Sequence, residues 1–404
     1  MLTIQYLEDS PALAHLDKQL VVDKLRTAAE RLPFTHLLIG WHVPSRILEA
    51  CRKEAENLGM RFLRWQPLLT LDPAIRSELE WRVRGLMGEK LAGYRGLPEF
   101  TFACPNHPAV QEAVYIHLEN VVRQGLYQGL FLDRVRYPSP AAYLPNDLAC
   151  FCEHCQRKAA QEGLDLNRVK QGIMRLTRDG ISASSLVKTL LSGEADPWQL
   201  DEIQSLGQFL VFRKKSIGDF LAHLTPMLRD NQMEIGPDCF SPSLTHLVGQ
   251  DLARLGNFAD WIKLMSYAHA LAPAGIPFEL SGLVRYLTKT GSLTEAQALE
   301  LIGQTLGLHL PPDLRSLEEG GLSPGALGKE VDHGRAASSK PVLAGIELVD
   351  MEGVVNLQPG QIRADLSILK HSGIAGLALS WDLLHIPLER LELVRQVYLH
   401  QPFA

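Results

Sequence analysis

Short apolar runs alternate with amphipathic segments along the whole chain. Eight of these runs have the length and composition of β-strands, and most are almost continuously hydrophobic, which is typical of strands buried on both faces of a sheet. They cover residues 3–8, 36–43, 61–68, 129–136, 233–240, 261–269, 342–349 and 373–383. A helical pattern follows each run, so the sequence predicts βα units arranged around a parallel sheet.

Eight βα units in one chain favour an α/β fold of the closed (β/α)8 kind, a TIM barrel, over a doubly wound open sheet. The open sheet is the alternative. Against it, no predicted strand is followed by a Gly-x-Gly-x-x-Gly or Gly-x-x-x-x-Gly-Lys turn of the kind that binds the phosphates of a nucleotide. No linker or longer repeat divides the sequence, so we expect residues 1–404 to form one barrel domain.

Two predicted connections are much longer than is usual in a barrel. Residues 139–231, after the fourth strand, contain a cysteine cluster and extra helices, including a long amphipathic helix from about 198 to 229. Residues 280–340, after the sixth strand, contain a helical pair and then a Gly/Pro-rich stretch. Insertions on the C-terminal side of a barrel usually form the rim of its site, although helices that only cover the barrel wall are a simpler alternative.

Composition and charge argue against nucleic acid and membrane as partners. The 404 residues are 46% hydrophobic and 21% charged, with a formal net charge of −6 at pH 7. No basic run would neutralise a phosphate backbone, so we expect no nucleic-acid partner. The sequence shows no signal peptide and no apolar run long enough to cross a bilayer, and we expect a soluble cytoplasmic protein without a membrane partner. Association into a homo-oligomer stays open.

Aromatic and polar side chains gather at the predicted C-terminal ends of the strands, where barrels of this type carry their sites. Sugars present apolar C–H faces and a rim of hydroxyl groups, so aromatic platforms with carboxylates, amides and imidazoles suit a carbohydrate substrate. The candidate substrate-binding residues are Tyr6, Trp41, His42, Trp65, Arg136, Tyr137, Asp238, Tyr267, Trp381 and Asp382.

Asp133 and Glu347 are the candidate catalytic pair. Asp133 ends the fourth strand beside two arginines, which would keep it ionised, as a nucleophile or a charge stabiliser requires. Glu347 lies in an apolar strand, where burial would raise its pKa, as a general acid requires. A glycosidase needs two carboxyls about 5 Å apart for retention or about 6.5 to 9.5 Å apart for inversion, and strand ends across a barrel mouth can meet that need.

Structural roles are the alternatives at these positions. Asp133 and Glu347 could each belong to a buried ion pair that only fixes a loop. Asp238 and Asp382 are reserve candidates for catalysis, but Asp238 could instead cap the next helix, since aspartate is a favoured N-cap residue. His42 and His269 are weaker candidates, because a lone histidine in a strand is more often a core residue.

Four cysteines predict a metal site. The Cys-x-Cys-x-x-Cys segment formed by Cys150, Cys152 and Cys155 brings three thiolates within reach of one ion, and Cys104 could complete a tetrahedron. Four sulfur ligands leave no open position, so we expect a structural Zn²⁺ and no catalytic cofactor. His154 is the rival fourth ligand, and four unligated buried thiols are the alternative to a metal. Cys51 and Cys239 are predicted to be ordinary core residues.

The sequence resembles two groups of sugar-cleaving barrels. Cys-Pro-Asn-x-Pro before and Cys-x-Cys-x-x-Cys after the fourth strand resemble the zinc-bearing β-galactosidases of glycoside hydrolase family forty-two, in which the four matching cysteines hold a structural zinc. Gly-Leu-Phe-Leu-Asp-Arg-Val-Arg-Tyr-Pro is similar to glycosidase-like barrels with an Asp-x-x-Arg-Tyr/Phe-Pro strand. Leu-Met-Ser-Tyr, in the sixth strand, is similar to several sugar-hydrolase barrels.

The resemblance implies a glycoside hydrolase that cleaves an O-glycosidic bond. One departure affects the roles, because the β-galactosidases carry an Asn-Glu pair where this chain has Asp133 and Arg134. If the family's nucleophile position carries over, Glu347 attacks and Asp133 is the acid, the reverse of the electrostatic assignment, and the two assignments stay open. A carbohydrate-binding barrel without catalysis is the second hypothesis. A metal-dependent amidohydrolase is disfavoured, because the His-x-His and further strand-end ligands that it needs are absent.

Overall fold

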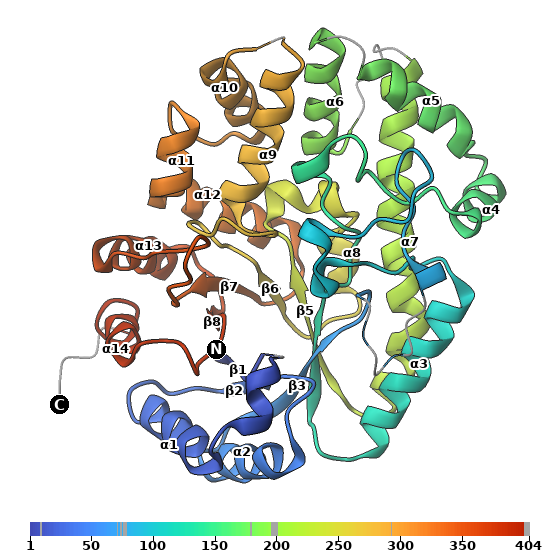
Figure 1. Cartoon of the computed structure of the whole chain (residues 1–404). Coiled ribbons are helices and arrows are strands. Elements are labelled where there is room, and N and C mark those ends of the chain that lie inside the picture. The colour runs from blue at the N-terminus through green and yellow to red at the C-terminus, as the bar shows by residue number, and fades with distance from the viewer. Residues whose placement is uncertain are drawn as a thin grey trace.

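Eight parallel strands close into a barrel in chain order, and the last strand pairs with the first (Figure 1). This computed structural model describes residues 1–8, 10–70, 72, 75, 79–177, 180–194, 201–291 and 293–399. The predicted (β/α)8 barrel is confirmed. Its strands are β1 (Leu2–Tyr6), β2 (His36–Ile39), β3 (Arg61–Pro67), β4 (Gly129–Asp133), β5 (Glu234–Cys239), β6 (Ile262–Leu264), β7 (Val342–Glu347) and β8 (Gly376–Ser380).

Seven strands lie inside the apolar runs that predict them, and β1 begins one residue before its run, at Leu2; several strands are shorter than their runs. The run at 373–383 contains the five-residue β8, and the run at 261–269 contains the three-residue β6. Hydrophobicity continues past the ladder because the residues that follow these strands are buried around the barrel mouth, as Tyr267 and Leu383 are. An apolar run therefore indicates that residues are buried. It does not show which of them pair in the β-sheet and which belong to a buried loop.

Helices cover the outside of the barrel between the strands. Asp17 caps the first of them by accepting hydrogen bonds from the backbone of Gln19 and Leu20 at its N-terminus. The helices of the ordinary βα connections are α1 (Lys18–Ala29), α2 (Ser45–Asn57), α3 (Pro108–Arg123), α8 (Leu252–Gly256), α13 (Pro359–His371) and α14 (Leu388–Val397).

The connections after β4 and β6 carry additional helices, and the second has four helices where the sequence predicts a helical pair followed by a Gly/Pro-rich stretch. The first holds α4 (Glu153–Gln161), α5 (Leu166–Leu176), α6 (Gly180–Ser192) and the long α7 (Asp201–Asp230), and the second holds α9 (Ile276–Lys289), α10 (Glu295–Leu306), α11 (Leu314–Gly320) and α12 (Pro324–Ala337). The predicted start of the long helix, at 198, lies outside the described residues. The two groups meet where α6 lies beside α9 and α10 (Figure 1).

Large side chains from several strands form an apolar cluster separate from the main core. Inward-pointing side chains fill a barrel of this size, so this cluster is the packed interior on which the mouth rests. Its members are Leu38, Trp41, Leu63, Trp65, Phe131, Trp261 and Leu343. Among the described residues, no helix combines the length and apolar character that crossing a bilayer requires.

Candidate active site

A cavity of about 340 Å³ opens at the mouth of the barrel. Residues at or just after the C-terminal ends of β1, β3, β4, β5, β6 and β8 line it, so it occupies the place where TIM barrels carry their chemistry. Six of the residues predicted from the sequence are brought together in its wall: Trp65, Asp133, Arg136, Asp238, Tyr267 and Trp381.

Asp133 is held as a hydrogen-bonded carboxylate at the end of β4. Its Oδ2 accepts a hydrogen bond of 2.9 Å from Nε1 of Trp65, and its Oδ1 accepts one of 2.6 Å from the backbone N–H of Arg134. Arg134 adopts a left-handed conformation, with φ of 55°. Both carboxylate oxygens thus have hydrogen-bond donors, and the residue is 6% exposed in the cavity wall.

Asp238, in β5, presents a second buried carboxyl to the same cavity. Its Oδ2 lies 2.9 Å from Nζ of Lys263, whereas its Oδ1 has no hydrogen-bond partner among the described residues. The pKa of Asp238 is raised to about 7, chiefly by burial; the Lys263 cation lowers it and the nearby charge of Asp133 raises it. The two buried carboxyls therefore have different partners: Asp133 accepts hydrogen bonds at both oxygens, whereas Asp238 pairs with a cation through one oxygen only.

A buried hydrogen-bond chain supports the floor of the cavity. Lys263, in β6, donates to Oη of Tyr267 at 2.7 Å as well as to Asp238. Tyr267 donates in turn to Oγ of Ser380 at 3.2 Å, and Ser380 donates to the side chain of Gln5. Trp381 packs its ring edge-on to Tyr267, with ring centroids 5.2 Å apart. This chain links β1, β6 and β8 and fixes the aromatic wall opposite Asp133.

Glu347 does not line the cavity. The carboxyl is 2% exposed, and its Oε1 accepts a hydrogen bond of 2.6 Å from the backbone N–H of His269. The imidazole of His269 contacts Asp365 of α13 at 2.7 Å. Burial raises the pKa of Glu347 to about 7, although the nearby His269 lowers it. Its observed partners tie the end of β7 to the loop after β6.

Three other predicted residues make structural contacts away from the cavity. Tyr6 donates from its hydroxyl to the carbonyl of Val21 in α1 at 2.9 Å. Asp382 accepts hydrogen bonds from the backbone N–H groups of Leu7, Glu8 and Leu384, and so holds the turn after β1 to the turn after β8. Tyr137 is fully buried beside the cysteine cluster.

Trp41 and His42 lie behind the cavity wall. Trp41 packs edge-on to Trp65, with ring centroids 5.5 Å apart, and the guanidinium of Arg134 lies 5.6 Å from its ring centroid. His42 lies 3.2 Å from Asp72 through its Nε2. Trp41 thus supports two side chains that line the cavity, and neither Trp41 nor His42 lines it.

Much of the rim comes from a segment that the sequence did not single out. Tyr94 and Phe100, from the connection between β3 and α3, line the cavity with edge-to-face packing and ring centroids 6.1 Å apart. Gly93 has φ of 76°, and a Cβ at this position would lie 2.1 Å from the carbonyl oxygen of Phe100. Only glycine fits this close turn, and the glycine-flanked aromatic Gly-Tyr-Arg-Gly is the one sequence signal that points to it.

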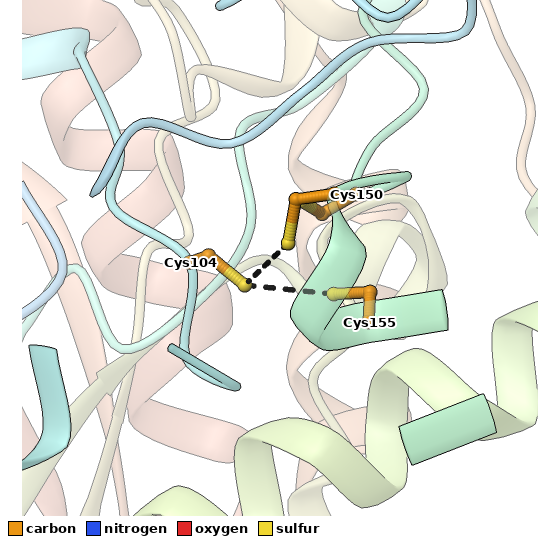
Figure 2. A group of neighbouring side chains, drawn as sticks. Cys104, Cys150 and Cys155 are labelled. Carbon is orange, nitrogen blue, oxygen red and sulfur yellow. Dashed lines mark hydrogen bonds between the residues drawn. The ribbon is translucent and has the colours of Figure 1, made fainter. Parts of the chain in front are cut away.

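The four predicted cysteines form one buried cluster beside this segment. Their sulfur atoms lie within 4.8 Å of one another, and Sγ of Cys104 is 3.5 Å from those of Cys152 and Cys155. Figure 2 shows Cys104, from the chain before α3, facing Cys150, from the chain before α4, and Cys155, from the first turn of α4. His154 is not part of the cluster and contacts His107 and Arg157 instead.

The donor set fits a tetrahedral metal ion. Zinc–sulfur bonds of about 2.3 Å place tetrahedral sulfur atoms about 3.8 Å apart, close to the observed spacing. The backbone N–H of Arg84 points to Sγ of Cys150, and Nδ2 of Asn106 points to Sγ of Cys155, both at 3.3 Å. Such donors are typical of the environment of a ligating thiolate. Cys51 and Cys239 are free and buried elsewhere.

Solved structures share this fold. The glycoside hydrolase domain of PgaB (BpsB) from Bordetella bronchiseptica superposes with a TM-score of 0.55 at 13% identity, over 98% of both chains. An alpha-L-fucosidase isoenzyme 2 from Paenibacillus thiaminolyticus gives 0.53 at 12% identity. A beta-galactosidase from the psychrophilic Marinomonas ef1 gives 0.57 at 9% identity. No family model and no curated protein matches the sequence.

These similarities establish the barrel fold. The chain matches 98% of its own length in the fucosidase and galactosidase comparisons, but it spans only 48% and 59% of those two proteins. At identities of 9 to 13%, the neighbours do not transfer substrates or catalytic residues to this chain.

Proposed function

We propose that this protein is a glycoside hydrolase that cleaves an O-glycosidic bond in the cavity at the barrel mouth. The observation that carries the proposal is the presence of two buried carboxyls, Asp133 and Asp238, in different environments of one aromatic-walled cavity. Glycoside hydrolysis uses two carboxyl groups in this way. The names of the structural neighbours, a glycoside hydrolase domain, a fucosidase and a galactosidase, agree with this class of reaction.

Environment suggests a division of roles between the two carboxyls. Asp238, with its raised pKa and its unpartnered Oδ1, is the proposed general acid that protonates the leaving oxygen. Asp133, hydrogen-bonded through both oxygens, is the proposed nucleophile or stabiliser of the positive charge at the anomeric carbon. Asp238 replaces Glu347 in this proposal because Glu347 does not line the cavity. Trp381, which is partly exposed in the cavity wall, offers a face on which a sugar ring can stack.

A carbohydrate-binding barrel without hydrolysis is the second candidate. The ion pair between Asp238 and Lys263 favours it, because a buried cation at 2.9 Å stabilises the ionised carboxylate and opposes proton donation. This candidate predicts affinity for a saccharide without turnover.

We also propose that Cys104, Cys150, Cys152 and Cys155 hold a structural Zn²⁺. The buried, mutually close sulfurs and the resemblance to the family forty-two enzymes support this assignment. A zinc ion bound by four thiolates crosslinks the segments before α3 and before α4 and takes no part in the reaction. Because the segment before α3 also carries Tyr94 and Phe100, the ion would stabilise one side of the cavity rim.

Turnover of aryl glycosides tests the proposal. A panel of 4-nitrophenyl glycosides and natural oligosaccharides is offered to the wild type and to the Asp133→Asn and Asp238→Asn variants. We expect at least one substrate to be hydrolysed, and each variant to lose about 100-fold or more in kcat, since each removes a group that acts on the reacting bond. Binding without turnover on the whole panel would replace the hydrolase with the binding barrel, and full activity of both folded variants would contradict the assigned residues.

A further inference from the structure

Arg136 is a buried cation that lines the mouth cavity without an ion-pair partner. It stands three residues beyond Asp133 and is 4% exposed. Its guanidinium lies between two aromatic rings, 4.7 Å from the centroids of both Phe102 and Phe240. Stacking of this kind holds the planar group in one orientation.

The hydrogen-bonding capacity of this guanidinium is mostly unused. Nη1 donates to the carbonyl of Tyr137 at 3.2 Å, and the buried Nε has no partner in the part of the chain that the structure describes. An arginine has five N–H donors, and a buried donor without a partner is costly unless something else satisfies it. Among the described residues, the guanidinium of Arg136 therefore keeps N–H donors without a protein partner in the wall of the cavity.

The other buried charges at this site have partners. Lys263 pairs with Asp238, while Arg134 lies 3.7 Å from Glu8 and 3.8 Å from Asp133. Across the described ranges, no carboxylate oxygen forms an ion pair with Arg136. Burial lowers the pKa of Arg136 to about 10, a value at which it stays charged at neutral pH. The carboxyls of Asp133, Glu279 and Asp238 raise the pKa of Arg136 from a distance, but none of them forms a direct ion pair with it. The guanidinium in the wall of the proposed sugar site is therefore open to a direct carboxylate partner.

The geometry points to a saccharide that carries a carboxylate, a uronic acid, as the ligand, with Arg136 as the residue that selects it. The fork of a guanidinium matches the two oxygens of a carboxylate, and this pairing would satisfy its spare donors. The inference rests on the proposed saccharide site but not on hydrolysis, because selection by Arg136 is a property of binding.

Matched pairs of ligands test the inference. Calorimetry measures the affinity of the Asp133→Asn protein for 4-nitrophenyl glucuronide against 4-nitrophenyl glucoside, and for the galacturonide against the galactoside, in both anomers. We expect the uronide of at least one pair to bind about ten- to a hundredfold more tightly, as a hydrogen-bonded charge pair would give. Equal affinities in every pair, or a preference for a glucoside 6-sulfate over the uronide, would overturn the inference.

Two variants assign the preference to the side chain. In Arg136→Met the ratio of uronide to neutral affinity should fall to near one, and in Arg136→Lys, which keeps the charge but not the fork, it should be intermediate. A ratio that is unchanged in a folded Arg136→Met protein would contradict the role of Arg136. If the uronide preference is found but no glycoside is hydrolysed, the hydrolase proposal fails and this inference stands. If only neutral glycosides are hydrolysed and no uronide is preferred, the hydrolase proposal stands and this inference fails.

Discussion

Nζ of Lys263 lies 2.9 Å from Oδ2 of Asp238, and both side chains are almost completely excluded from solvent. A buried ion pair is weak evidence for stability, but removing one partner leaves an uncompensated charge. Asp238 lines the cavity, and its pairing with Lys263 fixes the position of its Oδ2 and lowers its pKa. Its consequences for stability and for activity can be measured separately.

Removing the cation alone should destabilise the fold. We expect Lys263→Met to lower the free energy of unfolding at pH 8 by about 3 to 5 kcal/mol, because Asp238 is then buried as an unpaired anion. The double variant with Asp238→Asn should recover much of this loss, since no charge is left. Urea unfolding of the two variants and the wild type decides the matter, and equal stability of the single variant and the wild type would show that the pair is not coupled.

The proposed acid gives activity a basic limit. Asp238 must be protonated to act, and its pKa is raised to about 7, so kcat/KM should fall as the pH rises through that value. Because the Lys263 cation lowers the pKa of Asp238, the Lys263→Met variant should retain activity to higher pH than the wild type. The pH profile of hydrolysis of an accepted aryl glycoside measures both limits. A rate that stays constant from pH 6 to pH 9 would exclude Asp238 as the acid.

Glu347 should affect stability rather than catalysis. Its pKa rises from 4.5 in the unfolded chain to about 7 in the fold, so the folded state binds the extra proton and loses about 3 kcal/mol of stability as the pH rises from about 4.5 to 7. Glu347→Gln keeps an acceptor for the backbone of His269 and removes this loss. We expect kcat within about threefold of the wild type and a flatter dependence of unfolding free energy on pH. A hundredfold loss of kcat would return Glu347 to the catalytic pair.

Metal content tests the cysteine site. Purified protein should contain about one zinc per chain by mass spectrometry, and Cys155→Ser should lose it and melt about 5 to 10 °C lower, because the ion no longer crosslinks the two segments. Cys51→Ala is the matched control, since it removes a free buried thiol far from the cluster and should keep the metal. A metal-free wild type, or a Cys155→Ser protein with full zinc content, would argue for unligated thiols.

The barrel could be predicted because burial on both faces of a parallel sheet leaves a strong hydrophobic signal in each strand. Position along a strand also placed Asp133, Asp238 and Trp381 correctly at the mouth. The same reasoning does not predict the direction of a side chain. Glu347 ends β7 as Asp133 ends β4, yet the Glu347 carboxyl accepts a hydrogen bond from the backbone of His269. The path of the loop that contains His269 is set by tertiary packing.

Loop residues were the main omission from the predicted site. Tyr94 and Phe100 lie in a segment without regular periodicity, and their place in the cavity depends on long-range packing. The cysteine cluster behaves differently, because three of its members are fixed by local spacing and the fourth, Cys104, is identified by its sequence motif. A metal site can thus be predicted from the sequence when its ligands lie close together along the chain. The loop residues that form the rim of the cavity cannot be predicted in this way.

The hydrogen bond from Trp65 to Asp133 provides the last prediction. Trp65→Phe keeps an aromatic ring in the cavity wall but removes the Nε1 donor that lies 2.9 Å from Oδ2 of Asp133. A carboxylate that loses one of two positioning donors is less well oriented toward the anomeric carbon, so we expect kcat to fall about tenfold. Trp41→Phe is the matched control, because Trp41 packs 5.5 Å from the Trp65 ring and does not line the cavity. Steady-state kinetics on one aryl glycoside compares the two variants, and equal losses in both would indicate that packing, rather than the hydrogen bond, is what Asp133 requires.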